Sequence, residues 1–400
     1  MRIALCTNYV SPYRLPMYRE LSNRDGWDVT IFTSSDSGHD REWGRYDQDG
    51  TIRVQKSRSF SYRTIASYGK NGNKTSEYEE ATLRSIPLGL VVDLIKFRPD
   101  VIITGELGMR TVFAYIAGFL TRTPVIPWTY PSRAKISIGL CRRWTRRVLL
   151  RSAPAIIGMG KTAREMLVSE GADSMRIFNA PNAADLDSLR ESADQYIANN
   201  HVERVRAVIG FEKRIALVVG RLVEMKAPFH IRHAWALLPN SLRDQWELVY
   251  IGDGPLKKEL AESGMPGVRL IGTVPPNEVA HWLKACDLHI FASLGDPWGL
   301  VVNESMHLGK PTLCSKMAGC CDDLIVDGIT GFEFDPGLGL AEFATKLTET
   351  LLRDDLAKIG HNAQIHAASF TPKRMADGIA HAIESVLPSN GLKAHLGGAP

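Results

Sequence analysis

The chain has 400 residues, of which 44% are hydrophobic and 23% charged, and its formal net charge is +4. This is the composition of a globular protein, and its length exceeds what one hydrophobic core usually supports, so two domains are expected. No run reaches the roughly 18 uncharged apolar residues of a membrane-spanning helix.

The N-terminal part alternates short apolar runs with helical patterns, which predicts parallel β-α units. Strands are predicted at 3–7, 29–33, 101–104, 125–128 and 155–158. The first begins almost at the initiator Met, without the apolar run and cleavage site of a secretory signal. The polar, Gly- and Asn-rich segment 60–80 is interpreted as a long mobile loop.

A basic segment follows, because no acidic residue stands between Glu106 and Glu165. Within it, residues 133–151 interleave Arg and Lys with Ile, Leu, Val and Trp144. At helical spacing this gives a basic face beside an apolar one, which is typical of a helix lying on an anionic membrane. The alternative is a solvated basic helix that packs its Leu and Val against a sheet. Nucleic-acid binding is disfavoured, since no recognition motif accompanies the basic run.

Two sequence patterns in this half resemble the binding sites of other enzyme classes. Residues 155–162 end in Gly-Lys-Thr like a phosphate-binding loop, but the first required Gly is Ala155 and too few loop amides remain to wrap a triphosphate. Asp47 and Asp49 form an Asp-x-Asp pattern that some enzymes use for metals, and we interpret it as surface charge. No His, Cys and carboxylate cluster has metal-ligand spacing. The six cysteines include no CxxC pair and indicate reduced thiols in a cytoplasmic protein.

The second half begins after a turn at 181–187 and a polar segment that extends to residue 213. Strands are predicted at 215–219, 248–251, 268–271, 288–292 and 311–314. A last helix begins at Thr371-Pro372 and ends at Pro388. We therefore expect an α/β fold of two doubly wound, Rossmann-like domains at 1–182 and 183–370, a final helix at 371–387 and a tail at 388–400.

The strand at 215–219 leads into Gly220, Arg221 and, five residues later, Lys226. Two cations at the carboxyl end of a strand suit a diphosphate, with each charge-assisted contact worth roughly 1.5 to 3 kcal/mol. Alternatively, they are ordinary surface residues. The next strand delivers Gly252, Asp253 and Gly254, whose backbone amides either face the same ligand or form a tight turn.

Asp296 and Glu304 are the most informative pair. Asp296 lies on the loop that leaves the predicted strand 288–292, and Glu304 lies in the following helix. Ligands of open parallel sheets bind at this edge. Between the two acids stand Trp298, Gly299 and Leu300.

The order of these motifs resembles the retaining glycosyltransferases of family four, which have the GT-B fold with a central cleft between two domains. The motifs are Gly220-Arg-Leu-x-x-x-Lys226, Ile251-Gly-Asp-Gly-Pro255, the acid at 296 with Glu304, and Asp327-Gly-x-x-Gly-Phe332. Residues 8–16 resemble the first loop of that family. The resemblance extends from residue 1 to about residue 387.

The resemblance implies the roles of the donor-site residues. Arg221 and Lys226 would hold the diphosphate, and Glu304 the ribose hydroxyls. Asp296 would contact the sugar, helped by backbone groups of Trp298, Gly299 and Leu300. Asp296 stands where the family usually has Glu, so its shorter reach leaves the sugar contact and the choice of donor open.

The resemblance also points to the first domain for the acceptor. Many family members carry a His after the strand that corresponds to 125–128, and residues 128–133 contain none. Tyr130 and Arg133 either replace it or are loop residues. Asn8, Ser11, Pro12 and Arg14 follow the first strand and are expected to face the cleft, unless Pro12 to Pro16 simply begin a helix.

The implied function is the retaining transfer of a hexose from a UDP- or GDP-sugar to an acceptor hydroxyl, without a metal or another cofactor. A polysaccharide, lipopolysaccharide or lipid-linked intermediate at the inner face of a bacterial plasma membrane would explain the basic segment. Two alternatives stay open: a nucleotide-sugar hydrolase or epimerase on the same fold, and a non-catalytic nucleotide-sugar-binding protein.

Overall fold

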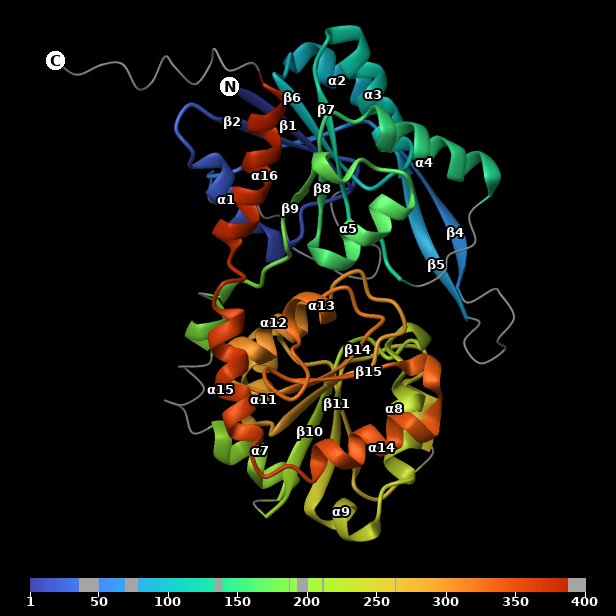
Figure 1. Ribbon diagram of the computed structural model, residues 1–400, viewed down its shortest axis with the longest axis vertical. Helices are drawn as coiled ribbons and strands as arrows, with labels where there is room; N and C mark the ends of the chain where they lie inside the picture. Colours follow the sequence, from blue (N-terminus) through green and yellow to red (C-terminus); the bar gives the residue numbers. More distant parts are fainter. Residues whose placement is uncertain are drawn as a thin grey trace, which may run out of the picture.

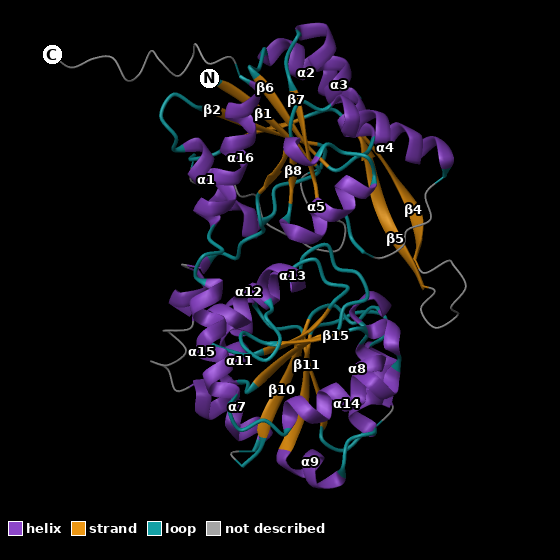
Figure 2. Cartoon of the chain, in the orientation of Figure 1, coloured by secondary structure: helices purple, strands orange, loops and turns teal. Residues whose placement is uncertain are grey.

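Two parallel sheets organise the chain into two lobes, one above the other (Figure 1). The computed structural model describes residues 1–35, 50–68, 78–133, 139–186, 188–192, 201–210, 212–262 and 264–387. The strand order is β3-β2-β1-β6-β7-β8-β9 in the first lobe and β12-β11-β10-β13-β14-β15 in the second, with helices around each sheet (Figure 2). The predicted α/β class with two doubly wound units is confirmed.

The first sheet contains all five strands predicted for it. Its strands are β1 (Arg2–Thr7), β2 (Asp28–Thr33), β3 (Arg53–Lys56), β6 (Val101–Gly105), β7 (Val125–Thr129), β8 (Ile156–Gly158) and β9 (Ile177–Asn179). Its helices are η1 (Pro12–Arg14), α1 (Leu15–Ser22), α2 (Leu90–Phe97), α3 (Met109–Thr121), α4 (Leu140–Ser152), α5 (Gly160–Ser169) and η2 (Ser174–Arg176). β3 and the three-residue β9 were not predicted; the four residues of β3 are all exposed and carry no apolar alternation.

The second sheet also contains its five predicted strands. Its strands are β10 (Arg214–Val219), β11 (Trp246–Ile251), β12 (Val268–Gly272), β13 (Leu288–Phe291), β14 (Thr312–Ser315) and the three-residue β15 (Phe332–Phe334), which was missed. The helices are α7 (His201–Ile209), η3 (Glu224–Lys226), α8 (Pro228–Ala236), α9 (Asn240–Gln245), α10 (Lys257–Glu262), α11 (Pro276–Ala285), α12 (Leu300–His307), α13 (Cys321–Leu324), η4 (Pro336–Leu338), α14 (Leu340–Leu351) and α15 (Leu356–Ala367).

A long hairpin corrects the interpretation of residues 60–80 as a mobile loop. β4 (Phe60–Tyr68) and β5 (Tyr78–Ile86) pair antiparallel, from Phe60 opposite Ile86 to Tyr68 opposite Tyr78. Phe60, Tyr62 and Thr64 alternate along β4, and the Phe60 and Tyr62 rings stack at 6.3 Å. The polar composition concealed this β-forming alternation. Residues 69–77, the most Gly- and Asn-rich part, lie outside the described residues, as do Asp47, Asp49 and the tail 388–400.

The last helix returns the chain to the first lobe. α16 (Pro372–Val386) begins as predicted, with the Thr371 hydroxyl accepting a hydrogen bond from the Arg374 backbone amide. Its apolar face buries Met375 and Ile379 in the first lobe's core, and Asp377 pairs with Arg24. α16 lies beside α1, whereas α15 packs on α12 in the second lobe (Figure 1).

A polar latch joins the lobes at the amino end of α5. The Lys161 amide donates to Asp323 at 2.8 Å, the Thr162 hydroxyl donates to Asp322 at 2.7 Å, and Arg133 pairs with Asp322. The Gly-Lys-Thr pattern therefore presents its helix terminus to carboxylates of α13. Burial raises the pKa of Asp323.

Replacing Asp322 by Asn should loosen this latch. The variant loses the ion pair with Arg133 and a charge-assisted bond from Thr162, so we expect the free energy of unfolding to fall by about 1 to 3 kcal/mol. Urea denaturation measures the loss. Asp25→Asn, at an exposed position, is the control and should leave the midpoint unchanged. Equal midpoints for the two variants would show that the latch adds nothing to stability.

Candidate functional site

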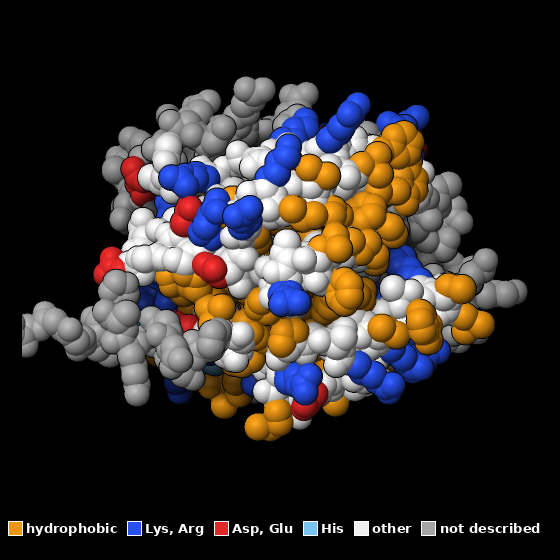
Figure 3. All heavy atoms as spheres, turned by 90° about the horizontal axis from the view of Figure 1, so that it is seen from above, with side chains coloured by type: hydrophobic (Ala, Val, Ile, Leu, Met, Phe, Trp, Pro, Cys, Tyr) orange, Lys and Arg blue, Asp and Glu red, His pale blue; other side chains and the backbone are white. Residues whose placement is uncertain are grey.

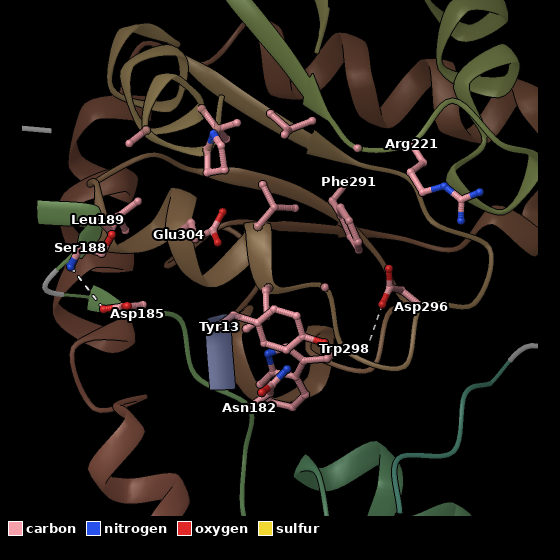
Figure 4. Close-up of a pocket in the computed structure, with 18 of the residues that line it drawn as sticks. Tyr13, Asn182, Asp185, Ser188, Leu189, Arg221, Phe291, Asp296, Trp298 and Glu304 are labelled. Atoms are coloured by element: carbon pink, nitrogen blue, oxygen red, sulfur yellow. Dashed lines mark hydrogen bonds between the residues drawn. The ribbon is translucent and has the colours of Figure 1, made fainter. Parts of the chain in front are cut away.

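A cavity of about 870 Å³ opens where strands β10 and β13 of the second lobe end, facing the first lobe. Its volume falls within the range typical of small-molecule sites. The expected donor-site residues gather in its wall (Figure 4): Gly220, Arg221, Lys226, Asp296, Trp298, Gly299, Leu300 and Glu304. Tyr13, Arg14 and Tyr130 line it from the first lobe.

Glu304 offers an unpaired acid to this cavity. It lies on the second turn of α12, whose first residue follows Gly299. Gly299 has a φ of 104°, and a Cβ there would lie 2.7 Å from the Phe291 ring, so glycine is needed at this turn. Within the described part of the chain, no hydrogen bond or ion pair reaches the Glu304 carboxylate. Burial raises its pKa to about 7. Such a carboxylate is well suited to accept two ligand hydroxyls.

Lys226 and Asp296 form an ion pair across the cavity wall. The Lys226 ammonium donates to the Asp296 carboxylate and lies 4.8 Å from the centre of the Phe291 ring. The second Asp296 oxygen accepts from the Trp298 amide at 3.2 Å, while the Asp296 amide donates to the Ser293 hydroxyl at 3.1 Å. These contacts fix the short acid in place.

Arg221 adds a second cation from the loop that follows β10. In Figure 4 it lies on the side of Phe291 and Asp296, whereas Glu304 lies on the opposite side of the view. The cavity therefore has two cations on one side, one of them paired with Asp296, and the unpaired Glu304 carboxylate on the other. That polarity suits an elongated ligand with an anionic centre and a hydroxyl-bearing end.

Three further residues expected at the donor site lie outside the cavity. The Gly252 amide donates to the Gly272 carbonyl, and the Gly254 amide donates to its neighbour, the Asp253 carboxylate. A Cβ on Gly252 would come within 1.9 Å of the Gly220 carbonyl oxygen. These glycines allow two loops to pack backbone against backbone, which corrects the expectation that their amides face the ligand.

On the acceptor side, Arg14 and Tyr130 line the cavity as expected. Arg14 is only 8% exposed, and its guanidinium lies 4.7 Å from the Trp128 ring and 5.3 Å from the Tyr130 ring. Tyr130 in turn donates to Glu106 at 3.3 Å. Cation–π contacts of this kind stabilise the guanidinium at this position.

The other expected acceptor residues lie elsewhere. Asn8 accepts a hydrogen bond from Arg110 at 3.2 Å, and the Ser11 carbonyl accepts one from the Arg14 amide as η1 begins at Pro12. Arg133 belongs to the latch with Asp322. The expectation that these four residues face the ligand is therefore corrected: Asn8, Ser11 and Pro12 shape the turn that positions Arg14, and Arg133 joins the lobes.

The connection between the lobes forms part of the cavity wall, which was not predicted from the sequence. Asn182, Asp185, Ser188 and Leu189 line the cavity (Figure 4). The Asn182 carbonyl accepts from Asn303, which also accepts from the Trp298 indole at 2.7 Å. No motif marks this segment, because it meets α12 only through tertiary contacts such as that of Asn182 with Asn303.

Metal-binding geometry is not found among the residues that the structure describes. No group of three or more His, Cys, Asp or Glu side chains there is arranged to hold an ion. All six cysteines are free thiols, and only Cys141 is exposed.

Comparison with known proteins finds similarity to a family in the second lobe. Residues 199–366 match the model of the glycosyl transferases group 1. The chain is 27% identical over 290 residues to a sulfoquinovosyl transferase of Arabidopsis thaliana, covering 68% of this chain and 54% of that protein. It is 26% identical over 230 residues to a D-inositol 3-phosphate glycosyltransferase of Geodermatophilus obscurus, covering 54% and 49%. The chain thus spans about half the length of these relatives.

Solved structures agree in fold over nearly the whole chain. HepE of Anabaena, crystallised with UDP and glucose, superposes with a TM-score of 0.70 at 19% identity, covering 96% of this chain and 100% of that chain. WaaG, a glycosyltransferase involved in lipopolysaccharide biosynthesis, superposes with a TM-score of 0.62 at 15% identity, covering 96% and 100%. At such identities the likeness concerns the fold alone, and it confirms the expected GT-B arrangement.

Proposed function

We propose, on the premise that residues 199–366 belong to the glycosyl transferases group 1, that this protein transfers a hexose from a nucleotide sugar to an acceptor hydroxyl. One observation carries the proposal. The same cavity holds the Lys226 and Arg221 cations on one side and the unpaired Glu304 carboxylate on the other. Those are the two kinds of group that a nucleoside diphosphate needs, since it has anionic phosphates and a ribose with two hydroxyls.

The donor would lie along the floor of the cavity. Glu304 accepts hydrogen bonds from the ribose, Lys226 and Arg221 bind the diphosphate, and Asp296 meets the sugar. The amino end of α12 directs its partial positive charge toward the phosphates. UDP is the natural first donor nucleotide to test, because HepE was crystallised with UDP and glucose; GDP is the second.

Stabilising the leaving group would be the main catalytic contribution. Lys226 exchanges Asp296 for a phosphate oxygen when the donor binds, and Arg221 supplies the second cation, so the negative charge that develops on the diphosphate is neutralised without a metal. We propose retention of configuration, with the departing phosphate accepting the acceptor proton.

Nucleotide release in the presence and absence of acceptors tests the proposal. The protein is incubated with UDP- and GDP-sugars, with and without an extract of glycans and lipid-linked glycans, and nucleotide release is followed. Release that depends on the extract is expected. Full-rate release without any acceptor would replace the proposal with hydrolysis or epimerisation, and binding without release under either condition would indicate a sensor.

For the acceptor, we propose a glycan or lipid-linked glycan reached at an anionic membrane surface. Large hydrophobic side chains are exposed on or beside α2, α3 and α4: Leu88, Val92, Ile95, Ile116, Phe119, Leu120, Leu140, Trp144 and Val148. Viewed from above, hydrophobic side chains gather in a broad band with Lys and Arg beside it (Figure 3). Among the described helices, none is long and apolar enough to cross a bilayer.

α4 carries the basic part of this surface. Arg142, Arg143, Arg147 and Arg151 are exposed around Trp144, which is 69% exposed. Leu149 and Leu150 pack inward, as the alternative of a packed helix predicts, while the exposed Leu140, Trp144 and Val148 support the proposed membrane surface. Arg146 is excluded from the basic face by its 3.0 Å ion pair with Glu170, and residues 134–138 lie outside the described ranges.

Charge reversal on α4 should weaken membrane binding. Each basic residue near an anionic surface contributes about 1 kcal/mol, so Arg143→Glu with Arg147→Glu should weaken binding to phosphatidylserine vesicles by at least roughly 30-fold. Sedimentation with vesicles measures this. The matched control reverses Lys258 and Lys358, which are exposed on the second lobe, and should bind as wild type. If both pairs bind equally well, α4 does not face the membrane.

A further inference from the structure

A second cavity, of about 700 Å³, lies in the first lobe where β2 and β3 end. Its walls are polar and basic, and the described residues that line it include no acid: Ser34, Ser35, Ser57, Ser59, Lys56 and Arg58, with Ser61 at the start of the hairpin. It opens at the carboxyl edge of the sheet, the edge that binds ligands in open parallel folds. None of the residues that line the donor cavity lines this second cavity.

The groups in its walls are donors that suit an oxyanion. Arg58 is exposed, and among the described residues its guanidinium has no hydrogen-bond or ion-pair partner. Ser57 is 1% exposed, and its hydroxyl is a buried polar group with no hydrogen-bond partner. Buried hydroxyls are nearly always paired, so an orphan in the wall of a basic cavity points to a missing acceptor. A guanidinium and serine hydroxyls together match the several oxygens of a phosphate.

A short chain of side chains connects this cavity to the donor site. Arg110, which is 6% exposed, donates to the Ser34 hydroxyl at 3.4 Å and lies 4.0 Å from the Glu106 carboxylate. Glu106 accepts from Tyr130 at 3.3 Å, and Tyr130 lines the donor cavity. Arg110 also holds Asn8, whose carbonyl accepts the amides of Ser34 and Ser35. The two cavities therefore share one edge of the first sheet and are linked by a network of polar side chains.

We propose that this second cavity binds a phosphate group carried by the acceptor, and so sets the acceptor's orientation toward the donor site. The inference that the phosphate belongs to the acceptor rests on the proposed transferase function. Phosphate binding in this cavity does not depend on that function. Arg58 and the serines bind the phosphate, while the rest of the acceptor extends past Glu106 to bring a hydroxyl to Tyr130 and the sugar. This narrows the acceptor class to phosphorylated glycans and lipid phosphates.

Thermal unfolding of the full chain in inorganic phosphate tests the site. The titration is done at constant ionic strength with saturating UDP, which occupies the Arg221 side of the donor cavity, and acetate replaces phosphate in a parallel series. Phosphate should raise the wild-type Tm and acetate should not. Arg58→Ala should weaken the apparent phosphate affinity at least about tenfold, because it removes a charge-assisted contact. Arg53→Ala removes an exposed arginine at the start of β3, outside the cavity, and should behave as wild type.

Two more variants separate the outcomes. Arg58→Gln keeps most of the side-chain length without the charge and should show the same loss as Arg58→Ala, even if the alanine variant folds poorly. Arg221→Ala should lose the Tm increase caused by UDP and keep the increase caused by phosphate. A phosphate response that survives both Arg58 substitutions, or that acetate reproduces, overturns the site. A wild type that responds to phosphate through Arg58 but not to any nucleotide would contradict the proposed function while leaving the site in place.

Discussion

Lys226→Ala is expected to lower kcat/KM for the nucleotide sugar by roughly 100- to 1000-fold, the usual cost of removing one donor that stabilises a developing anion. Lys226 is the cation best placed for this role, because it projects from η3 into the cavity and is held over the Phe291 ring. In the unliganded protein its partner is Asp296, so the diphosphate must replace that carboxylate. Steady-state kinetics with varied donor measure the effect, which should fall mainly on kcat.

Because Lys226 pairs with Asp296, the Lys226→Ala variant needs a control for the effect on Asp296. Lys226→Ala leaves a partly buried carboxylate without its cation, so part of any loss could come from a displaced Asp296. The double variant Lys226→Ala with Asp296→Asn removes that charge, and we expect it to recover folding stability but not kcat. Lys258→Ala, an exposed lysine whose partner is Glu262, should match wild type. Unchanged kinetics in Lys226→Ala would remove this residue from the diphosphate site.

Glu304→Gln should mainly weaken donor binding. A hydrogen bond to a charged group is worth roughly 1.5 to 3 kcal/mol, so we expect kcat/KM to fall by about 10- to 100-fold, chiefly through a higher KM. Glutamine keeps the shape of the side chain and one acceptor oxygen, which limits any structural effect. A titration of UDP by calorimetry should show the same loss, whereas Glu349→Gln, on α14 in the same lobe, should not. An equal affinity in wild type and Glu304→Gln would contradict the ribose role.

The same residue predicts a pH dependence. Burial raises the pKa of Glu304 to about 7, so in the free protein the carboxylate forms only as the pH rises through this value. The kcat/KM of the wild type should therefore increase between pH 6 and pH 8 with a midpoint near 7. Glu304→Gln should lack this step. A midpoint that persists in the variant would assign the titration to another group.

The free energy of unfolding should fall as the pH rises, in the direction opposite to kcat/KM. The folded-state pKa lies above the ordinary value of 4.5, so between these values the folded protein holds a proton that the unfolded chain has lost. The stability contributed by the protonated form is complete below about pH 4.5 and is lost as the pH rises to about 7. Glu304→Gln should therefore lose less stability over this interval than wild type. The acid is thus retained at a cost to stability, as expected of a binding residue.

The sequence was informative about the second lobe because its motifs sit where strands end. Gly220, Arg221 and Lys226 follow β10, and Asp296 follows β13, so parallel pairing of these strands was enough to predict that they meet. Gly252 and Gly254 misled the same reasoning. These two glycines allow one loop to pack against another. A sequence does not distinguish a glycine that makes room for a ligand from one that makes room for backbone.

The first lobe was less predictable because its contacts are tertiary. Arg133 was expected in the cleft, but it pairs with Asp322, 189 positions along the chain, and so joins the two lobes. The hairpin β4–β5 was concealed by its polar composition. The linker residues Asn182 and Asp185 carry no motif, and their place in the cavity wall depends on how the two lobes pack.

The most direct test of the account is a calorimetric titration of UDP and of GDP into wild type and into the triple variant Arg221→Ala, Lys226→Ala, Glu304→Gln. We predict that wild type binds at least one of the two nucleotides with one site per chain, and that the triple variant, while folded, binds neither. A folded triple variant that binds the nucleotide as tightly as wild type would contradict the claim that this cavity is the donor site.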